Sequence, residues 1–327
     1  MVISSTVLTD LYSAVRGELN AVERLFDEEL SNPHPFIREL CGRVGQYRGK
    51  MLRPALVLLC GESCGGVHPA HRTLAAVVEM VHLATLVHDD VLDDAEVRRR
   101  SATINAEYGN MTAVLLGDYL ISHAYHLCSS LRDQHAARTI GATTNTVCEG
   151  ELIQQSRRGD PELAEGEYLQ IIRSKTASLT GACCSLGAHY AGAEPGVCTS
   201  MGEFGVAAGV AFQIVDDLLD VMGDSTDTGK SVGRDLAMGT TTLPVIHCLS
   251  TADGPVRARL RAVVAGDAPF HRSDVRSWLE TSDSIDYAFG VAREFVEKAI
   301  GHLSVLRPSQ AKETLVAMAE FILSRRW

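Results

Sequence analysis

Apolar residues along this chain recur with the spacing of helices rather than of strands. The stretch 74–88 is apolar on most sides, is rich in Ala and Leu, and is too long for a strand, which predicts a buried helix. Segments 111–131 and 204–222 have the same character. Breaks with Gly and Pro, among them Gly65-Gly66 and the stretch 157–161, separate such segments. Neither an alternating strand pattern nor a low-complexity linker is found. The pattern predicts an all-α fold in one domain, 1–327.

Composition narrows the class of ligand. The chain has 327 residues, of which 46% are hydrophobic, so it can bury a large core. Its formal net charge is −11, from 41 acidic and 30 basic residues. Such a chain is a poor candidate for binding nucleic acid or an anionic lipid surface. An anionic substrate would have to meet a local basic cluster or a bound cation.

The cysteines and the N-terminus predict a cellular compartment. Nine cysteines occur without a Cys-x-x-Cys pair, which is typical of small core residues in a reducing environment. The first twenty residues lack a basic start followed by an apolar run, so no signal peptide is expected. No segment approaches the ~18 uninterrupted apolar residues of a membrane span. We therefore expect a cytoplasmic protein that is not a membrane protein.

Two aspartate clusters lie on strongly apolar predicted helices. Asp89 and Asp93 are four residues apart and share one helix face, and Asp216 and Asp220 repeat that spacing. Unpaired carboxylates beside an apolar core are costly, so a chain that contains two such clusters must neutralise them. Mg²⁺ fits, because it takes one or two carboxylates and completes its shell with water and phosphate oxygens.

Two other interpretations of these clusters fit the sequence less well. Solvated acidic helix ends would explain one cluster but explain two copies poorly. A di-iron carboxylate bundle is the second alternative, because Glu79 and His82 have its Glu-x-x-His spacing. That site needs a second Glu-x-x-His motif, which the sequence lacks.

Basic residues stand near the clusters in short groups. Lys50 and Arg53 are one helical turn apart, and Arg98 begins a run of three arginines just after the first cluster. Lys175 lies between the clusters and Lys230 follows the second. Each could be an ordinary surface charge, but together they are the usual ligands of a diphosphate.

These motifs resemble the trans-isoprenyl diphosphate synthase, or polyprenyl synthetase, family over about residues 49–244. In order, the motifs are Gly49-Lys50-x-x-Arg53-Pro54, His82, Asp89-Asp90-x-x-Asp93 followed by Arg98-Arg99, Gly117-Asp118, Gly150-Glu151-x-x-Gln154, Lys175-Thr176-Ala177, Phe212-Gln213-x-x-Asp216-Asp217-x-x-Asp220, Gly229-Lys230 and Thr242-Leu243-Pro244. The resemblance implies an isoprenoid-synthase-type helical bundle around a deep central cavity, usually a homodimer. It also implies the head-to-tail condensation of isopentenyl diphosphate with an allylic prenyl diphosphate.

The same resemblance implies roles for single residues. Three Mg²⁺ ions would be held directly by Asp89, Asp93 and Asp216, with support through water from Asp90, Asp217 and Asp220. The allylic diphosphate would be bound by Arg98, Lys175 and Lys230. Isopentenyl diphosphate would be bound by Lys50, Arg53, His82 and Arg99. The path of the developing carbocation would be lined by Thr176 and Gln213.

Product length is predicted from Ala84 and Thr85, one turn before Asp89. Both are small, and in the family that the chain resembles, aromatic residues at these positions stop growth early. We therefore expect a product longer than geranylgeranyl diphosphate. The alternative is a floor formed by bulky residues elsewhere. The candidates are Tyr119, Tyr125 and Met111.

The last of these motifs departs from the family pattern. Where the family has Gly-Lys-x-Thr-Leu-Pro, this chain has Thr240 in place of the diphosphate-binding lysine. Either the allylic substrate binds less tightly, or a neighbour such as Arg234 compensates.

Two rival functions fit the sequence less well. A class I terpene cyclase usually lacks the second aspartate cluster, and a non-catalytic subunit or metal-binding scaffold would be expected to lack one cluster. Both clusters are complete here, which favours the prenyltransferase.

Overall fold

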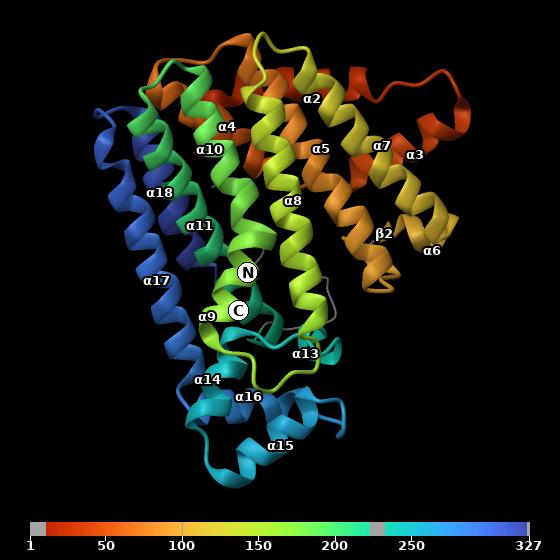
Figure 1. The fold of residues 1–327 in the computed structure, drawn as a ribbon, viewed down its shortest axis with the longest axis vertical. Helices are drawn as coiled ribbons and strands as arrows, with labels where there is room; N and C mark the ends of the chain where they lie inside the picture. Colours follow the sequence, from red (N-terminus) through yellow and green to blue (C-terminus); the bar gives the residue numbers. More distant parts are fainter. Residues whose placement is uncertain (1–10, 100, 223–232, 326–327) are drawn as a thin grey trace.

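Helices form a tall bundle in the computed structural model, which describes residues 11–99, 101–222 and 233–325 (Figure 1). The α-helices are α2 (Arg16–Glu29), α3 (Pro35–Tyr47), α4 (Leu52–Cys64), α5 (Pro69–Leu92), α6 (Ile104–Tyr108), α7 (Asn110–Ser129), α8 (His135–Ser156), α9 (Glu165–Ile172), α10 (Ser178–Tyr190), α11 (Pro195–Met222), α13 (Arg234–Ala237), α14 (Leu243–Thr251), α15 (Gly254–Val264), α16 (Arg272–Thr281), α17 (Ser284–His302) and α18 (Gln310–Ser324). The other elements are the 3-10 turns η1 (Ser13–Val15) and η3 (Leu303–Val305), the π-helix η2 (Arg173–Ala177) and the antiparallel pair β1 (Val97–Arg98) and β2 (Ser101–Ala102). The predicted all-α class is confirmed.

The three apolar segments singled out in the sequence form long helices. Segment 74–88 lies within α5, 111–131 largely coincides with α7, and 204–222 is the C-terminal part of α11. Proline begins both α5 and α11, where its missing N–H removes no helical bond. The predicted break after α4 is made by Gly65 and Gly66, whose φ values of 156° and 114° favour glycine.

The core surrounds α5 and α11. The helix α5 packs against α4 and α7, and α11 packs against α10 and α17. Because α5 and α11 are covered on several sides, most of their apolar residues are fully buried. Both aspartate clusters lie at the C-terminal ends of these two helices, and Asp93 is the residue that follows α5. Among the described residues, no helix has the length and apolar character to cross a membrane.

A π-helix interrupts the run of α-helix at Lys175 and Thr176. Such one-turn bulges redirect side chains and are frequent at functional sites. Two glycines let the neighbouring helices approach it: a Cβ on Gly150 would lie 2.6 Å from the backbone N of Lys175, and one on Gly209 would lie 2.7 Å from Cα of Ala177. The bulge is therefore clamped between α8 and α11.

This clamp can be tested with matched glycine substitutions. Gly209→Ala should destabilise the protein by about 1–3 kcal/mol, because the added methyl group overlaps the backbone of the bulge. Gly290→Ala, in the interior of α17 where a Cβ meets no atom within 4 Å, should instead stabilise it by about 0.5–1 kcal/mol. Denaturant unfolding measures both, and equal effects of the two substitutions would contradict the clamp.

Candidate active site

The first aspartate cluster is held by arginines from three segments. Asp90 is 1% exposed and accepts a hydrogen bond at Oδ1 from Nε of Arg98 at 2.8 Å, and Nη2 of Arg98 lies 2.8 Å from the same oxygen. The strand pair β1 and β2 turns the chain back and brings Arg98 to this carboxylate. Asp93 accepts at 3.0 Å from Nη2 of Arg158, and Nη2 of Arg234 lies 3.5 Å from its other oxygen.

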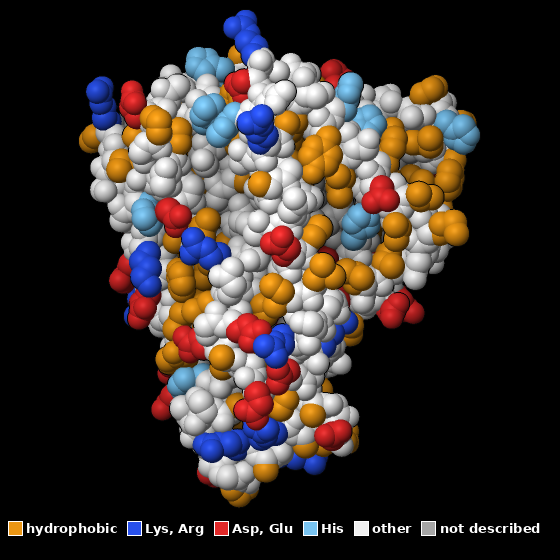
Figure 2. Space-filling view, in the orientation of Figure 1, with side chains coloured by type: hydrophobic (Ala, Val, Ile, Leu, Met, Phe, Trp, Pro, Cys, Tyr) orange, Lys and Arg blue, Asp and Glu red, His pale blue; other side chains and the backbone are white. Residues whose placement is uncertain are grey.

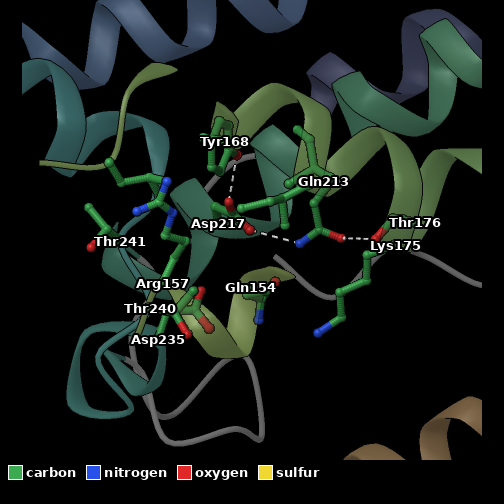
Figure 3. A pocket seen from close by; sticks show the side chains of 13 residues that line it. Gln154, Arg157, Tyr168, Lys175, Thr176, Gln213, Asp217, Asp235, Thr240 and Thr241 are labelled. Atoms are coloured by element: carbon green, nitrogen blue, oxygen red, sulfur yellow. Dashed lines mark hydrogen bonds between the residues drawn. The ribbon is translucent and has the colours of Figure 1, made fainter. Parts of the chain in front are cut away.

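A chain of hydrogen bonds orients the second cluster (Figure 3). Asp217 accepts at 2.6 Å from the hydroxyl of Tyr168 and at 2.7 Å from Nε2 of Gln213. The Thr176 hydroxyl donates at 2.9 Å to Oε1 of Gln213, which fixes the orientation of the amide. Burial raises the pKa of Asp217 to about 7, although both donors favour its charged form.

The other two carboxylates of the second cluster also have partners. Nη2 of Arg325 lies 3.0 Å from Oδ1 of Asp216, and its guanidinium stands 4.3 Å over the ring of Phe212. Asp220 accepts from the backbone N–H groups of Arg234 at 3.4 Å and Asp235 at 3.1 Å.

One residue shows that the two clusters line a common space. Arg234 contacts Asp93 with its guanidinium and donates its backbone N–H to Asp220. The carboxylates of α5 and α11 therefore lie within the reach of a single arginine. They are not on separate surfaces of the molecule.

Lys175 and Asp89 lie between the clusters in a strongly charged setting. Nζ of Lys175 lies 2.5 Å from Oε2 of Glu151. Burial lowers the pKa of Lys175, but the negative charges of Asp89 and Glu151 outweigh that effect and raise it, so the side chain is a cation. Burial raises the pKa of Asp89 to about 6, with Lys175 opposing the shift.

A polar pocket of about 100 Å³ adjoins these groups (Figure 3). Its wall contains Lys175 and Thr176 from the bulge, and Gln213 from α11. Thr240, which stands where the resemblance implies a lysine, lines the same pocket. The substitution therefore removes a positive charge from the wall of the site.

The second group of cations lies at the start of α4 and around His82. The guanidinium of Arg99 occupies the space beside Gly49, where a Cβ would stand 2.6 Å from Nη2. Arg99 has a left-handed backbone, with φ of 51°, in the turn between β1 and β2. Burial, followed by the charges of Arg53 and Arg99, lowers the pKa of His82 far below its usual value, so the imidazole is neutral.

Glu79 belongs to this cationic group. It is buried, and the nearby charges of Arg53, Arg48 and Arg99 oppose the rise of its pKa that burial causes. It is therefore a counter-charge to arginines. Among the residues that the structure describes, no three His, Cys, Asp or Glu side chains are close enough to hold a metal by themselves.

The aspartate clusters nevertheless suit a hard divalent cation. Their donors are all carboxylate oxygens, and Oδ2 of Asp90 is buried without a hydrogen-bond partner. A cation there would need further oxygens from water or phosphate, which is how Mg²⁺ is commonly bound. The donor set therefore fits Mg²⁺ bound together with a diphosphate.

The predicted residues that remain are Lys230 and those that concern product length. Lys230 lies outside the described residues. Ala84 is fully buried, whereas Thr85 is partly exposed and donates to the carbonyl of His82 at 2.7 Å. Met111 is 79% exposed and Tyr125 lies at the surface, so neither forms an internal floor in this chain.

Sequence reasoning missed Arg158, Arg325 and Tyr168. Arg158 belongs to the stretch 157–161, which the sequence predicts only as a break between helices. Arg325 is 109 positions from Asp216, so no local pattern joins them. Tyr168 carries no recognisable motif, although a buried tyrosine hydroxyl needs a partner and here finds Asp217.

Two facing carboxylate clusters with cations on both sides, held in an all-helical bundle, define a site suited to a diphosphate bound together with a divalent cation. Comparison with known proteins agrees. Residues 34–281 match the family model described as polyprenyl synthetase. The chain belongs to the polyprenyl synthetase family.

Relatives and solved structures match nearly the whole chain. The all-trans-nonaprenyl-diphosphate synthase (geranyl-diphosphate specific) of Rhodobacter capsulatus is 33% identical over 317 residues, covering 97% of each chain. The octaprenyl diphosphate synthase of Escherichia coli is 33% identical over 299 residues, covering 91% of this chain and 93% of the relative. A polyprenyl synthase from Caulobacter crescentus, complexed with calcium and isoprenyl diphosphate, superposes with a TM-score of 0.93 at 28% identity over 98% of both chains. The predicted family, fold and prenyltransferase activity are confirmed.

The raised pKa of Asp89 predicts a cost to stability that depends on pH. Below its usual value of 3.8 the carboxyl is protonated in both the folded and the unfolded state, and above about 6 it is charged in both, so the cost develops between these pH values and is complete above them. Asp89→Asn should therefore stabilise the metal-free protein at pH 7.5, by on the order of 2 kcal/mol, but not at pH 4. Denaturant unfolding in a chelating buffer measures this. The exposed Asp94→Asn should show no such difference, and an equal gain in both variants would contradict the assignment.

Proposed function

We propose that this enzyme elongates an allylic prenyl diphosphate with isopentenyl diphosphate, uses Mg²⁺, and releases a product longer than geranylgeranyl diphosphate. The observation that carries the proposal is the common space between the two aspartate clusters, with separate cationic groups on two sides. The names of the nonaprenyl and octaprenyl relatives support the long product. So do the small side chains of Ala84 and Thr85.

At the allylic diphosphate, the aspartates would bind the metal and the basic side chains would bind the leaving group. Asp89, Asp93 and Asp216 would hold Mg²⁺, three ions with substrate bound, with Asp90, Asp217 and Asp220 in support. When bound, the cation stabilises the charge that develops on the leaving diphosphate. The calcium in the Caulobacter structure supports a divalent ion in this family. On the protein's side, Lys175 and Arg98 would neutralise the leaving group, and Lys230 is proposed beside them.

Two residues would face the carbocation left behind. The Thr176 hydroxyl and the Gln213 amide are joined by a hydrogen bond of 2.9 Å, and Gln213 is anchored on Asp217. Their oxygens supply partial negative charge without a free nucleophile. Water would have to be excluded from this site while the isopentenyl double bond attacks the cation.

Isopentenyl diphosphate would be held by Lys50, Arg53, His82 and Arg99. Nε of Arg53 is buried and has no partner, so a ligand oxygen there would satisfy a donor that the protein leaves free. A neutral His82 can donate one hydrogen bond without adding charge. The second diphosphate would thus have its own cradle, which a cyclase does not need.

The homodimer is a further part of the proposal, with both copies acting as single polyprenyl synthetase domains over residues 1–327. Apolar side chains are exposed along α7 and α8, on the face seen in Figure 2. They are Met111, Val114, Leu115, Leu152 and Ile153. A helix stripe of this kind is typical of a face covered by another chain. The cytoplasmic location also stays a prediction.

The proposed reaction can be tested directly. Incubation with Mg²⁺, farnesyl diphosphate and labelled isopentenyl diphosphate should give labelled products, and a chelator should abolish them. An Asp89→Asn/Asp216→Asn double variant should lose on the order of a thousandfold in kcat, while Asp94→Asn retains activity. Farnesyl diphosphate consumed without uptake of label would indicate a cyclase, and full activity of the double variant would refute the proposed site.

Product length can be tested at Thr85, which is partly exposed on the face of α5 that carries Asp89. Thr85→Phe should shorten the product, because the ring blocks the path of the growing tail. Thr85→Val keeps the size and should keep the length. Ala84→Phe should also shorten the product, although Ala84 is fully buried and its neighbours must move. Chromatography of the product alcohols measures all three, and unchanged length in both Phe variants would remove these residues from the tail path.

A further inference from the structure

The lysine missing at position 240 leaves the wall of the allylic site without one of its expected charges. We propose that Arg158 is a diphosphate-binding residue of this site and supplies the positive charge that Thr240 lacks. The inference rests on the proposed function, because it names a further residue for the same substrate. It uses three independent features of the structure, namely a backbone contact, an ion pair and an unsatisfied donor.

The backbone contact places Arg158 beside Thr240. The N–H of Gly159 donates to the carbonyl of Gly239 at 2.8 Å. Both glycines have φ of 73°, and a Cβ on Gly239 would stand 3.1 Å from the N of Gly159. The two loops therefore touch at these glycines. Arg158 precedes Gly159 and Thr240 follows Gly239, so both residues flank the same contact.

The side chain of Arg158 reaches the metal-binding face of α5. Its Nη2 donates to Oδ1 of Asp93 at 3.0 Å, and the guanidinium side chain is only 24% exposed. Burial raises the pKa of Glu151, but the charge of its partner Lys175 and, to a smaller extent, that of Arg158 lower it. The guanidinium therefore lies at the first aspartate cluster, and its charge acts on the partner of the lysine proposed to bind the allylic diphosphate.

Arg158 keeps one donor available for a ligand. Its Nε is buried and has no hydrogen-bond partner. An unsatisfied buried donor costs about 1–3 kcal/mol, which an oxygen of a bound diphosphate would recover. Thr240 cannot fill this role with its backbone, because its N–H already donates to the carbonyl of Asp235 at 2.8 Å.

Two other arginines are near and are less suited. Arg157 lines the pocket, but Glu167 binds it at 2.6 and 3.0 Å and Asp160 at 3.2 Å, so its charge is already matched by two carboxylates. Arg234, considered above as a substitute, donates to the backbone carbonyl of Asp93 at 3.3 Å and lies near its carboxylate. Among these arginines, Arg158 is the one with a buried and unpaired donor.

The test is a charge exchange between the two positions. Arg158→Gln should raise the KM for farnesyl diphosphate about tenfold or more, as expected for the loss of a charged hydrogen bond, and should change the KM for isopentenyl diphosphate less than about twofold. Adding Thr240→Lys should restore the first value to within about threefold of the unmodified enzyme. Arg157→Gln is the matched comparison. Adding Thr240→Lys to Arg157→Gln should not lower the KM for farnesyl diphosphate.

A binding measurement separates this inference from the proposed reaction. The probe is inorganic diphosphate with Mg²⁺, and the readout is the rise in Tm that it causes. That rise should shrink in Arg158→Gln and return in the Arg158→Gln/Thr240→Lys double variant. No labelled product from any variant, together with this binding pattern, would refute the reaction and leave Arg158 in place. Normal affinity in Arg158→Gln, or a loss that Thr240→Lys does not repair, would overturn the inference.

Discussion

Carboxylates buried at the ends of two apolar helices are the constraint on which the rest of this structure depends. A charged carboxylate in such a place is stable only beside a cation or a hydrogen-bond donor. Asp90, Asp93 and Asp216 each contact an arginine, and Asp217 lies between a tyrosine and a glutamine. The protein has therefore assembled the counter-charges of its site before any substrate arrives.

Those counter-charges suit the reaction as well as the fold. A guanidinium that pairs with a carboxylate in the free enzyme can also donate to a diphosphate oxygen, since it has five donors in a fixed fork. When the substrate binds, the guanidinium then exchanges a carboxylate oxygen for a diphosphate oxygen, and no new charged site has to form. In the second cationic group, around His82, the neutral imidazole and the buried Glu79 limit the repulsion among Arg53, Arg99 and their neighbours.

The backbone features of the site follow from the same requirement for close placement. The π-helix carries Lys175 and Thr176 toward the pocket, and Gly150 and Gly209 let α8 and α11 press against it. The turn between β1 and β2 brings Arg98 and Arg99 back to α5 and α4. Small residues and short irregular segments thus set the positions of the charged side chains.

The sequence alone determined the helical class, the two aspartate clusters and the chemistry that they favour, because helical periodicity and motif spacing are local properties of the chain. It also identified Thr240 as a departure from the expected pattern. Only the tertiary structure showed that Arg158 and Arg325 reach these clusters, that Met111 points to the surface, and that Gly159 and Gly239 join two loops. Such contacts link positions tens to more than a hundred residues apart, and they are selected by how the helices pack. No pattern within a single segment contains that information.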